Sequence, residues 1–298
     1  MHGASNVGGS KLDRFKPLLF ILPAFIFYII FVVVPIINTA YYSFFDWNGA
    51  NPVMKFIGID NYSKLLTDEL FWKALFHNII WIVCTVAIPV FLGLILAVLL
   101  TSKKIKGILL FRVTYFMPTI VSMVVVSIVW SWIYHPDFGK VNTTLSAIGM
   151  ENFTRSWLGD ENTVLGALVA ASSWTYYGFC MVIFMAAIQG IDKTYYEVAM
   201  IEGAKPYQTF FRVTIPLLKN TTTLLVLNSL IVSFKVFDII YIMTKGGPYH
   251  SSEVISTYMF TNAFYKNQVG YGAAVALVLA LVIALCSAAY LRYAERDD

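Results

Sequence analysis

The chain has 298 residues, of which 58% are hydrophobic and only 13% charged, and its formal net charge is +4. A typical soluble domain carries about 25% charged residues, and the apolar residues here form long blocks instead of amphipathic faces. The composition therefore excludes an ordinary soluble domain and predicts an integral membrane protein, with no basic patch that would indicate nucleic-acid binding.

Six apolar segments are long enough to cross the hydrocarbon core, which requires about 20 residues of helix. They cover about 17–41, 72–100, 108–134, 164–188, 217–243 and 271–291. No segment shows the alternating pattern of a membrane β-strand, so we expect an all-α integral membrane fold. Residues 17–293 would form one six-span domain between the short tails 1–16 and 294–298.

The distribution of basic residues predicts the orientation. Thirteen lysines and arginines lie in predicted loops on the side of the N-terminus, and seven lie on the opposite side. The positive-inside rule then places both termini in the cytoplasm. The first span follows "KLDRFK" but is longer than the apolar core of a signal peptide and has no small-residue cleavage site after it, so we interpret it as an uncleaved anchor.

Motifs for catalysis and cofactor binding are missing from the sequence. It has no GxxxxGK[ST] phosphate loop and no HExxH pair, and its four histidines are scattered. The three cysteines are single and far apart within apolar spans, which does not suggest a disulfide or metal framework. We therefore expect a chain that is not an enzyme and binds no cofactor or metal.

The loop 189–216 carries signals for two short helices. Thr194 and Glu197 have the spacing of a capping box, in which each side chain accepts a backbone N–H of the other end of the first turn. The first helix would run to Lys205, and Pro206 would stop it and begin a second helix. That second helix would lead back into the membrane at Pro216.

Two interpretations of this loop remain open on the residues alone. The helix could lie on the membrane surface, with Glu197 serving only as a cap. Gly203 argues against this interpretation, because a glycine inside a helix costs about 1 kcal/mol relative to alanine. A close backbone contact with another molecule would explain the glycine.

The spacing within this loop resembles a known motif. The motif EAA-x3-G-x9-I-x-L-P has the same spacing as residues 197–216. Its EAA corresponds to Glu197-Val198-Ala199, its glycine to Gly203, and its I-x-L-P to Val213-Thr214-Ile215-Pro216. This motif marks the permease subunits of bacterial ATP-binding-cassette importers. Val198, Val213 and Ile215 depart from it but stay apolar. Other stretches, such as "FKVFDIIYIMTKGGP", are similar to the sugar-importing branch, which includes multiple-sugar, lactose and glycerol-phosphate permeases.

The resemblance implies a type I importer fold in a bacterial inner membrane and a coupling helix that docks on a separate ATPase dimer. ATP and Mg²⁺ would then bind to that partner and not to this chain. A second permease subunit and an extracytoplasmic solute-binding protein would complete the machine, with a carbohydrate as substrate. The residues expected to contact the ATPase are Glu197, Val198, Ala199, Glu202, Gly203, Ala204, Lys205 and Pro206.

A substrate path is predicted from polar and aromatic residues within the spans. Lys235 and Asp238 would share one helix face at i and i+3, either as a structural ion pair or beside the path. Asn228 and Tyr241 would lie near them. The rings of Trp130, Trp132, Trp174, Tyr176 and Tyr177 could stack on sugars or could anchor the membrane interface. We select Asn228, Lys235, Asp238, Tyr241, Trp174 and Tyr177 as candidate path residues.

The alternatives are an importer of the same class for another small solute, such as an amino acid or phosphate, and a membrane enzyme or secondary transporter that works alone. The sequence does not identify the individual sugar.

Overall fold

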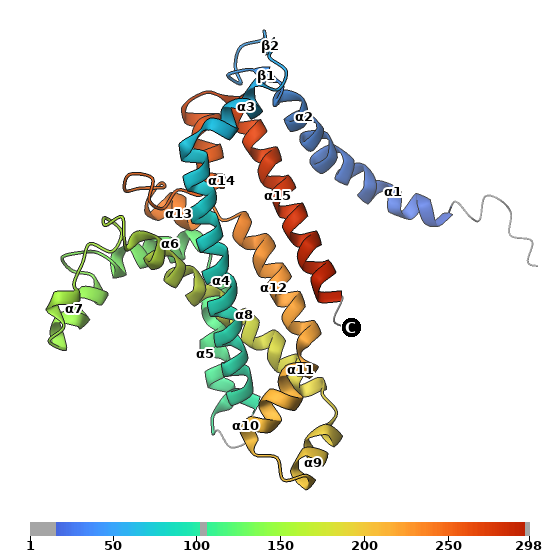
Figure 1. Cartoon of the computed structure of the whole chain (residues 1–298), viewed down its shortest axis with the longest axis vertical. Coiled ribbons are helices and arrows are strands. Elements are labelled where there is room, and N and C mark those ends of the chain that lie inside the picture. Colours follow the sequence, from blue (N-terminus) through green and yellow to red (C-terminus); the bar gives the residue numbers. More distant parts are fainter. Residues whose placement is uncertain (1–15, 102–105, 296–298) are drawn as a thin grey trace, which may run out of the picture. The chain divides into compact units, whose positions relative to one another are not determined.

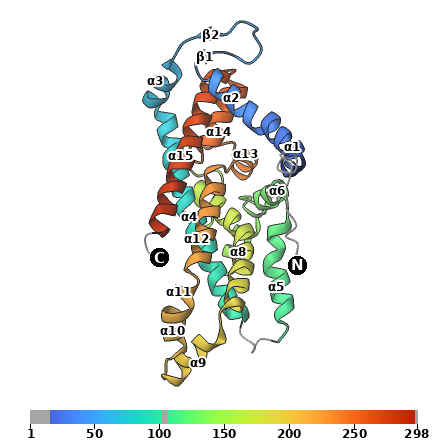
Figure 2. The same ribbon diagram turned by 90° about the vertical axis from the view of Figure 1, so that its right-hand side faces the viewer.

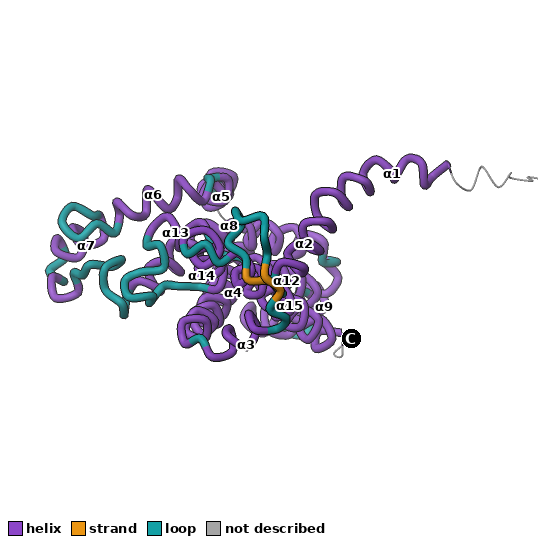
Figure 3. The backbone as a smooth tube through the Cα atoms, turned by 90° about the horizontal axis from the view of Figure 1, so that it is seen from above, coloured by secondary structure: helices purple, strands orange, loops and turns teal. Residues whose placement is uncertain are grey.

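The computed structural model describes residues 16–101 and 106–295, and these are mostly helical, with several longer loops (Figure 3). In chain order the longer helices are α1 (Lys16–Tyr28), α2 (Val34–Tyr42), α4 (Glu69–Thr101), α5 (Ile108–Ile120), α6 (Met123–Ile133), α8 (Val164–Gly190), α9 (Lys193–Ile201), α12 (Lys219–Phe234) and α15 (Val269–Glu295). The shorter helices are α3 (Asp60–Thr67), α7 (Lys140–Ala147), α10 (Pro206–Thr209), α11 (Ile215–Leu217), α13 (Asp238–Met243) and α14 (Ile255–Phe260). Two short strands, β1 (Phe45–Asp46) and β2 (Lys55–Phe56), form an antiparallel pair.

Four unbroken helices have the length and hydropathy to cross a membrane: Phe20–Tyr42, Glu69–Thr101, Val164–Gly190 and Val269–Ala294. Two further pairs pass the same test but are bent, Ile108–Ile120 with Met123–Ile133 by 101° and Pro206–Leu217 with Lys219–Phe234 by 64°. With each bent pair taken as one span the described chain has six spans. The all-α membrane fold predicted from the sequence is confirmed. The predicted span 108–134 is broken inside its apolar block, whereas the 64° bend lies at the start of the predicted span 217–243.

Irregular turns lie next to two of the prolines. A π-helical turn, η1 (Ile29–Val33), precedes Pro35, and another, η3 (Phe210–Thr214), precedes Pro216. A proline in a helix clashes with the carbonyl four residues earlier and lacks an N–H to bond it. In both cases that carbonyl belongs to the π-helical turn, whose wider winding makes room for the proline ring. The second helix of the loop therefore continues past Pro216 to Leu217 before it bends.

The chain divides into two units, and the smaller one contains residues 16–64 and 262–277. Its strand pair places Phe45 opposite Phe56 and Asp46 opposite Lys55. The buried Asn61 side chain donates hydrogen bonds to the carbonyls of Ser43 (2.8 Å) and Phe45 (3.1 Å), which attaches the start of α3 to the strand pair. A π-helical turn, η4 (Thr261–Tyr265), lies at the border of this unit.

The larger unit contains residues 65–261 and 278–295 of the described chain. Its centre is the pair α4 and α8, with α5 packed on α8 and α12 packed on α4 (Figures 1 and 2). Glycines permit the close approach of these helices. A Cβ on Gly93 of α4 would lie 2.5 Å from Cys180 Cβ and 2.8 Å from the backbone nitrogen of Met181 on α8. A 3-10 turn, η2 (Glu151–Phe153), and α7 lie in the connection between α6 and α8.

Candidate functional site

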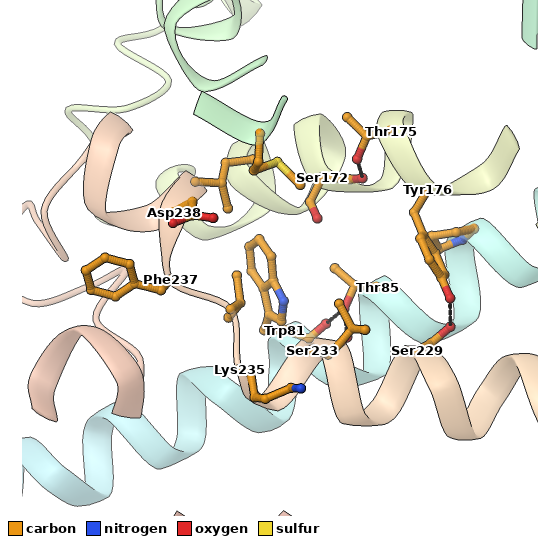
Figure 4. Close-up of a pocket in the computed structure, with 15 residues that line it drawn as sticks. Trp81, Thr85, Ser172, Thr175, Tyr176, Ser229, Ser233, Lys235, Phe237 and Asp238 are labelled. Atoms are coloured by element: carbon orange, nitrogen blue, oxygen red, sulfur yellow. Dashed lines mark hydrogen bonds between the residues drawn. The ribbon is translucent and has the colours of Figure 1, made fainter. Parts of the chain in front are cut away.

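A cavity of about 310 Å³ lies inside the larger unit, between α4, α8 and α12 (Figure 4). The helices place small polar residues on it at helical spacing. Trp81, Thr85 and Pro89 follow one face of α4, and Ser172, Thr175 and Tyr176 follow one face of α8. Ser229 and Ser233 of α12 complete this polar part of the wall. Since residues three and four apart share a helix face, each helix contributes a consistent stripe.

Hydrogen bonds between side chains join the helices around the cavity. Thr85 Oγ1 and Ser233 Oγ lie 2.9 Å apart and link α4 to α12. Thr85 Oγ1 also donates to the carbonyl of Trp81 at 2.7 Å, so the Ser233 hydroxyl donates in the bond between the two hydroxyls. On the other side Ser229 Oγ donates to the Tyr176 hydroxyl (3.3 Å), which donates in turn to Asn228 Oδ1 (2.9 Å).

Aromatic rings form the other part of the wall. Trp81 and Tyr176 line the cavity, as does Phe237, which stacks on Tyr241 with the ring centroids 4.9 Å apart and an interplanar angle of 15°. Hydroxyl groups beside aromatic faces suit a ligand that carries both hydroxyls and C–H faces, because ligand sites combine apolar walls with a few placed polar groups. The cavity is thus chemically suited to a small polyhydroxylated solute.

Lys235 and Asp238 both line the cavity, but they do not lie on one face of one helix. The helix α12 ends at Phe234, and Lys235, Val236 and Phe237 lie outside any helix before α13 begins at Asp238. Both side chains are exposed, and no salt bridge joins them in the described part of the chain. The prediction of a shared helix face is wrong, because the fifth span breaks between the two residues.

The other four predicted path residues do not line the cavity. Asn228 accepts the hydrogen bond from Tyr176, and Tyr241 stacks on Phe237. Both residues therefore contact a lining residue of the cavity without lining it themselves. Trp174 packs edge-on against Trp130 at 5.8 Å, and Tyr177 packs against Tyr115 at 6.4 Å.

Sequence reasoning missed most of the polar wall, whose residues are Thr85, Ser172, Thr175, Ser229 and Ser233, together with Trp81 and Phe237. A signal was present, since hydroxyl residues recur at spacings of three and four inside the apolar spans. Single Ser and Thr residues are tolerated anywhere in a membrane helix, however, because they bond to the preceding turn. A stripe of hydroxyl residues indicates a site only when the stripes of several helices line the same cavity.

The second predicted site is the corner formed by α9 and α10. The cap of α9 is Asp192, whose carboxylate Oδ1 accepts hydrogen bonds from the Thr194 backbone N–H (2.9 Å) and hydroxyl (2.8 Å). These two bonds lower the pKa of the Asp192 carboxyl below its usual value. The predicted capping box of Thr194 and Glu197 is therefore wrong, because a better acceptor two residues earlier occupies the cap position.

Gly203 lies beyond the helix and not inside it. The helix α9 ends at Ile201, and Gly203 has a left-handed φ of +74°. The Ala204 N–H donates to the carbonyl of Ala199 (2.9 Å) and the Gly203 N–H to that of Met200 (3.0 Å), which is the Schellman pattern of helix termination. Apart from the two neighbouring residues, no atom of the described chain lies within 4 Å of a Cβ built on Gly203, so the close contact expected there is not made within this chain.

The corner continues into α10 as the sequence predicted. Pro206 is the first residue of α10, and Gln208 Oε1 accepts from the Lys205 N–H at 2.8 Å. Of the residues expected to contact a partner, Ala199 and Ala204 are buried or half-buried, whereas the others are exposed and are Glu197, Val198, Glu202, Gly203, Lys205 and Pro206. Met200 and Ile201 of α9 are 68% and 86% exposed, so the corner presents an apolar surface next to its charges.

These features define a polytopic helical membrane protein with a polar and aromatic cavity inside its bundle and an exposed helical corner at one end of it. A family profile described as "Binding-protein-dependent transport system inner membrane component" matches residues 89–297. The chain belongs to this family. It is therefore an inner-membrane component of a transport system that depends on a binding protein.

Relatives support this membership over nearly the whole chain. The chain is 37% identical to the "Probable ABC transporter permease protein YurN" of Bacillus subtilis (strain 168), over 91% of this chain and 92% of the relative. It is 33% identical to the "Lactose transport system permease protein LacF" of Rhizobium radiobacter, over 93% and 94%. A subunit of a crystallised bacterial ABC transporter involved in alginate import has the same fold, with a TM-score of 0.82 at 22% identity, over 96% of this chain and 97% of that one.

Proposed function

We propose that this chain is a permease subunit of an ATP-driven, binding-protein-dependent sugar importer, and that it forms half of the translocation path. The observation that carries the sugar assignment is the cavity between α4, α8 and α12, where hydroxyl side chains face aromatic rings. Relatives named for the uptake of lactose, diacetylchitobiose and multiple sugars agree with this chemistry.

The path residues act together in this proposal. Sugar hydroxyls exchange hydrogen bonds with Ser172, Thr175 and Ser229, and the C–H face of the ring rests on Tyr176 or Phe237. Lys235 and Asp238 supply charged donors and acceptors at the break of the fifth span. Because these groups come from three helices, a relative shift of the helices opens the cavity to one side or the other.

The corner of α9 and α10 is proposed to couple this shift to a separate ATPase dimer, which binds ATP and Mg²⁺. Its support is the match of Glu197 to Pro216 with the importer motif and the exposure of Met200 and Ile201 at the corner. A second permease and an extracytoplasmic solute-binding protein complete the importer. The solved alginate transporter was crystallised with a periplasmic protein that holds an alginate pentasaccharide.

A substitution that fills the cavity tests the path. Ser172→Phe places a ring into the cavity from α8, whereas Ala186→Phe adds the same ring at an exposed position of the same helix. In proteoliposomes that contain the assembled importer, we expect Ser172→Phe to lower ATP-driven sugar uptake at least tenfold and Ala186→Phe to retain it. Full uptake by Ser172→Phe would show that sugar takes another route, and uptake driven by an ion gradient without ATP would overturn the importer assignment.

A charge reversal tests the coupling corner. We expect Glu197→Lys to abolish copurification of the ATPase while the chain still inserts in the membrane. Glu161→Lys, an exposed glutamate just before α8, is the matched control and should retain the ATPase. Retention of both the ATPase and sugar-stimulated ATP hydrolysis by Glu197→Lys would place the docking surface elsewhere.

A further inference from the structure

A second cavity, of about 530 Å³, lies where the ends of α4, α5 and α8 approach the start of α9. All of its lining residues belong to the larger unit. Its polar side chains are two cations and four neutral groups that form hydrogen bonds: Arg112 and Lys193, with Thr101, Gln189, Tyr196 and Thr214. Among the described residues, no acidic side chain lines it. Neither the sugar path nor the coupling corner accounts for this concentration of cations.

Arg112 is half-buried, and not all of the hydrogen-bond donors of its guanidinium have a partner in the described part of the chain. One of its terminal nitrogens, Nη2, donates to the carbonyl of Leu100 near the end of α4 at 2.9 Å. Its Nε is buried and has no hydrogen-bond partner in the described part of the chain. Buried donors in proteins nearly always have an acceptor, and a guanidinium is suited to the oxygens of a phosphate. The buried Nε is not itself accessible from the cavity, but Arg112 lines the cavity, so its guanidinium supplies positive charge there.

Lys193 adds a second charge that nothing in the described chain neutralises. It is exposed, lines the cavity and forms no salt bridge among residues 16–101 and 106–295. The adjacent Asp192 is committed to capping α9 through Thr194. Glu197 lies one turn further along α9 and does not line the cavity. The local field in the cavity is therefore positive and favours an anion.

The remaining wall is apolar, with Val98, Ile188 and Ile191. Near Arg112 on α5, Leu109 and Leu110 are 71% and 70% exposed, as expected for side chains that face lipid. The cavity thus combines cations, hydroxyls and an apolar wall at the ends of spanning helices, the level at which lipid headgroups lie. Basic pockets between membrane helices bind anionic headgroups in this way.

We propose that this cavity is a phosphate-binding site that takes the headgroup of an anionic phospholipid. Arg112 donates to the phosphate oxygens from its guanidinium, Lys193 provides the second positive charge, and the hydroxyls of Tyr196 and Thr214 lie in reach of the headgroup. Because Lys193 is the first residue of α9, a bound lipid also contacts the helix that begins the coupling corner.

Native mass spectrometry of the assembled importer tests the site. The complex is released from nanodiscs of phosphatidylcholine that contain a graded fraction of phosphatidylglycerol, and retained lipid is counted. We expect phosphatidylglycerol to be retained preferentially, and we expect Lys193→Gln to weaken its apparent affinity about fivefold, the effect of one basic residue near a membrane surface. Arg112→Gln should weaken it at least as much, and Arg112→Lys should restore only part of the loss.

The matched control is Lys106→Gln, which removes an exposed cation just before α5 that does not line the cavity. If Lys106→Gln and Lys193→Gln lower the apparent affinity for phosphatidylglycerol equally, the effect is only a general attraction between charges. That result would overturn the proposed site. Since Arg112→Gln also removes the bond to Leu100, Lys193→Gln decides the outcome if Arg112→Gln does not fold.

A second arm separates the two sources of phosphate. Inorganic phosphate is added at millimolar concentration to the complex in pure phosphatidylcholine, and binding is followed by the thermal stability of the complex. We expect no shift that depends on Lys193. The opposite result is a thermal shift with phosphate that Lys193→Gln abolishes, together with no preferential retention of phosphatidylglycerol. It would show that the cavity binds a soluble phosphate compound and would overturn the assignment to a lipid.

Discussion

Gly203 shows how one residue supports the corner of α9 and α10. Its φ of +74° lies in the left-handed region, which an L-residue with a Cβ adopts at a cost of about 1–2 kcal/mol. That conformation allows the N–H groups of Gly203 and Ala204 to bond back to Met200 and Ala199. The glycine is therefore required by the backbone of this chain, whatever the partner contacts.

We predict that Gly203→Ala destabilises the corner by about 1 kcal/mol, whereas Gly203→Asn does so less because asparagine tolerates the left-handed region. The measurement is hydrogen exchange of the Ala204 amide in the detergent-solubilised chain, which should become about fivefold faster in Gly203→Ala. Gly190→Ala is the control. Gly190 is the last residue of α8, its φ is not left-handed, and an added Cβ would meet no atom within 4 Å outside its own stretch of helix. Equal exchange in the two alanine variants would contradict the role of the backbone.

At the scale of elements, hydropathy predicted where the spans lie but not how they bend. The apolar blocks at 108–134 and 217–243 predict continuous helices. The structure breaks the first between Ile120 and Met123, and within the second α12 ends at Phe234 and α13 begins at Asp238. Hydropathy averaged over a window of about 20 residues does not show where a helix is interrupted for two or three residues. The break before Met123 is stabilised by a tertiary contact instead, because Thr119 Oγ1 donates to the carbonyl of Thr175 on α8.

The candidate site was predictable to a similar degree. The motif spacing located the corner of α9 and α10 and the role of Pro206 because both depend on neighbours in the sequence. Lys235 and Asp238 were found because charges within spans are rare. The hydroxyls of the cavity wall were not found, since their significance comes from the packing of α4, α8 and α12 around one volume.

The close packing of α4 and α8 gives a prediction at this scale. Gly93→Ala would force a Cβ to within 2.5 Å of Cys180 Cβ and against the backbone of Met181, so the two helices must separate. We expect it to destabilise the chain by about 1–3 kcal/mol. Gly166→Ala lies in the first turn of α8, where an added Cβ would meet no atom within 4 Å outside its own stretch of helix. It should be neutral or stabilising by about 0.5–1 kcal/mol. Denaturation in detergent measures both, and equal stability of the two variants would show that the helices pack less closely than described.

At the scale of the whole molecule the two bent pairs decide the topology. If each pair crosses the membrane, the described chain has six spans, and both termini lie on one side, which the excess of basic residues predicts to be the cytoplasm. If the pair α5 and α6 instead enters and leaves on the same side, the loop that contains Glu151 changes sides.

Labelling of introduced cysteines distinguishes these topologies. In a chain whose Cys84, Cys180 and Cys286 are replaced by alanine, single cysteines are introduced at the exposed residues Asn51 and Glu151. Between them lie α4 and the bent pair, so a spanning pair returns the chain to the side of Asn51. We expect a maleimide that cannot cross the membrane to label both positions from outside intact cells.

A third cysteine, at the exposed Glu202, completes the test. The single unbroken helix α8 separates it from Glu151, so it should be labelled only after the cells are opened. If Asn51 is labelled from outside and Glu151 is not, the 101° bend marks a re-entrant loop and the corner of α9 and α10 lies outside the cell. An ATPase in the cytoplasm could not reach it there, so the accessibility of Glu151 tests the six-span fold and the coupling proposal together.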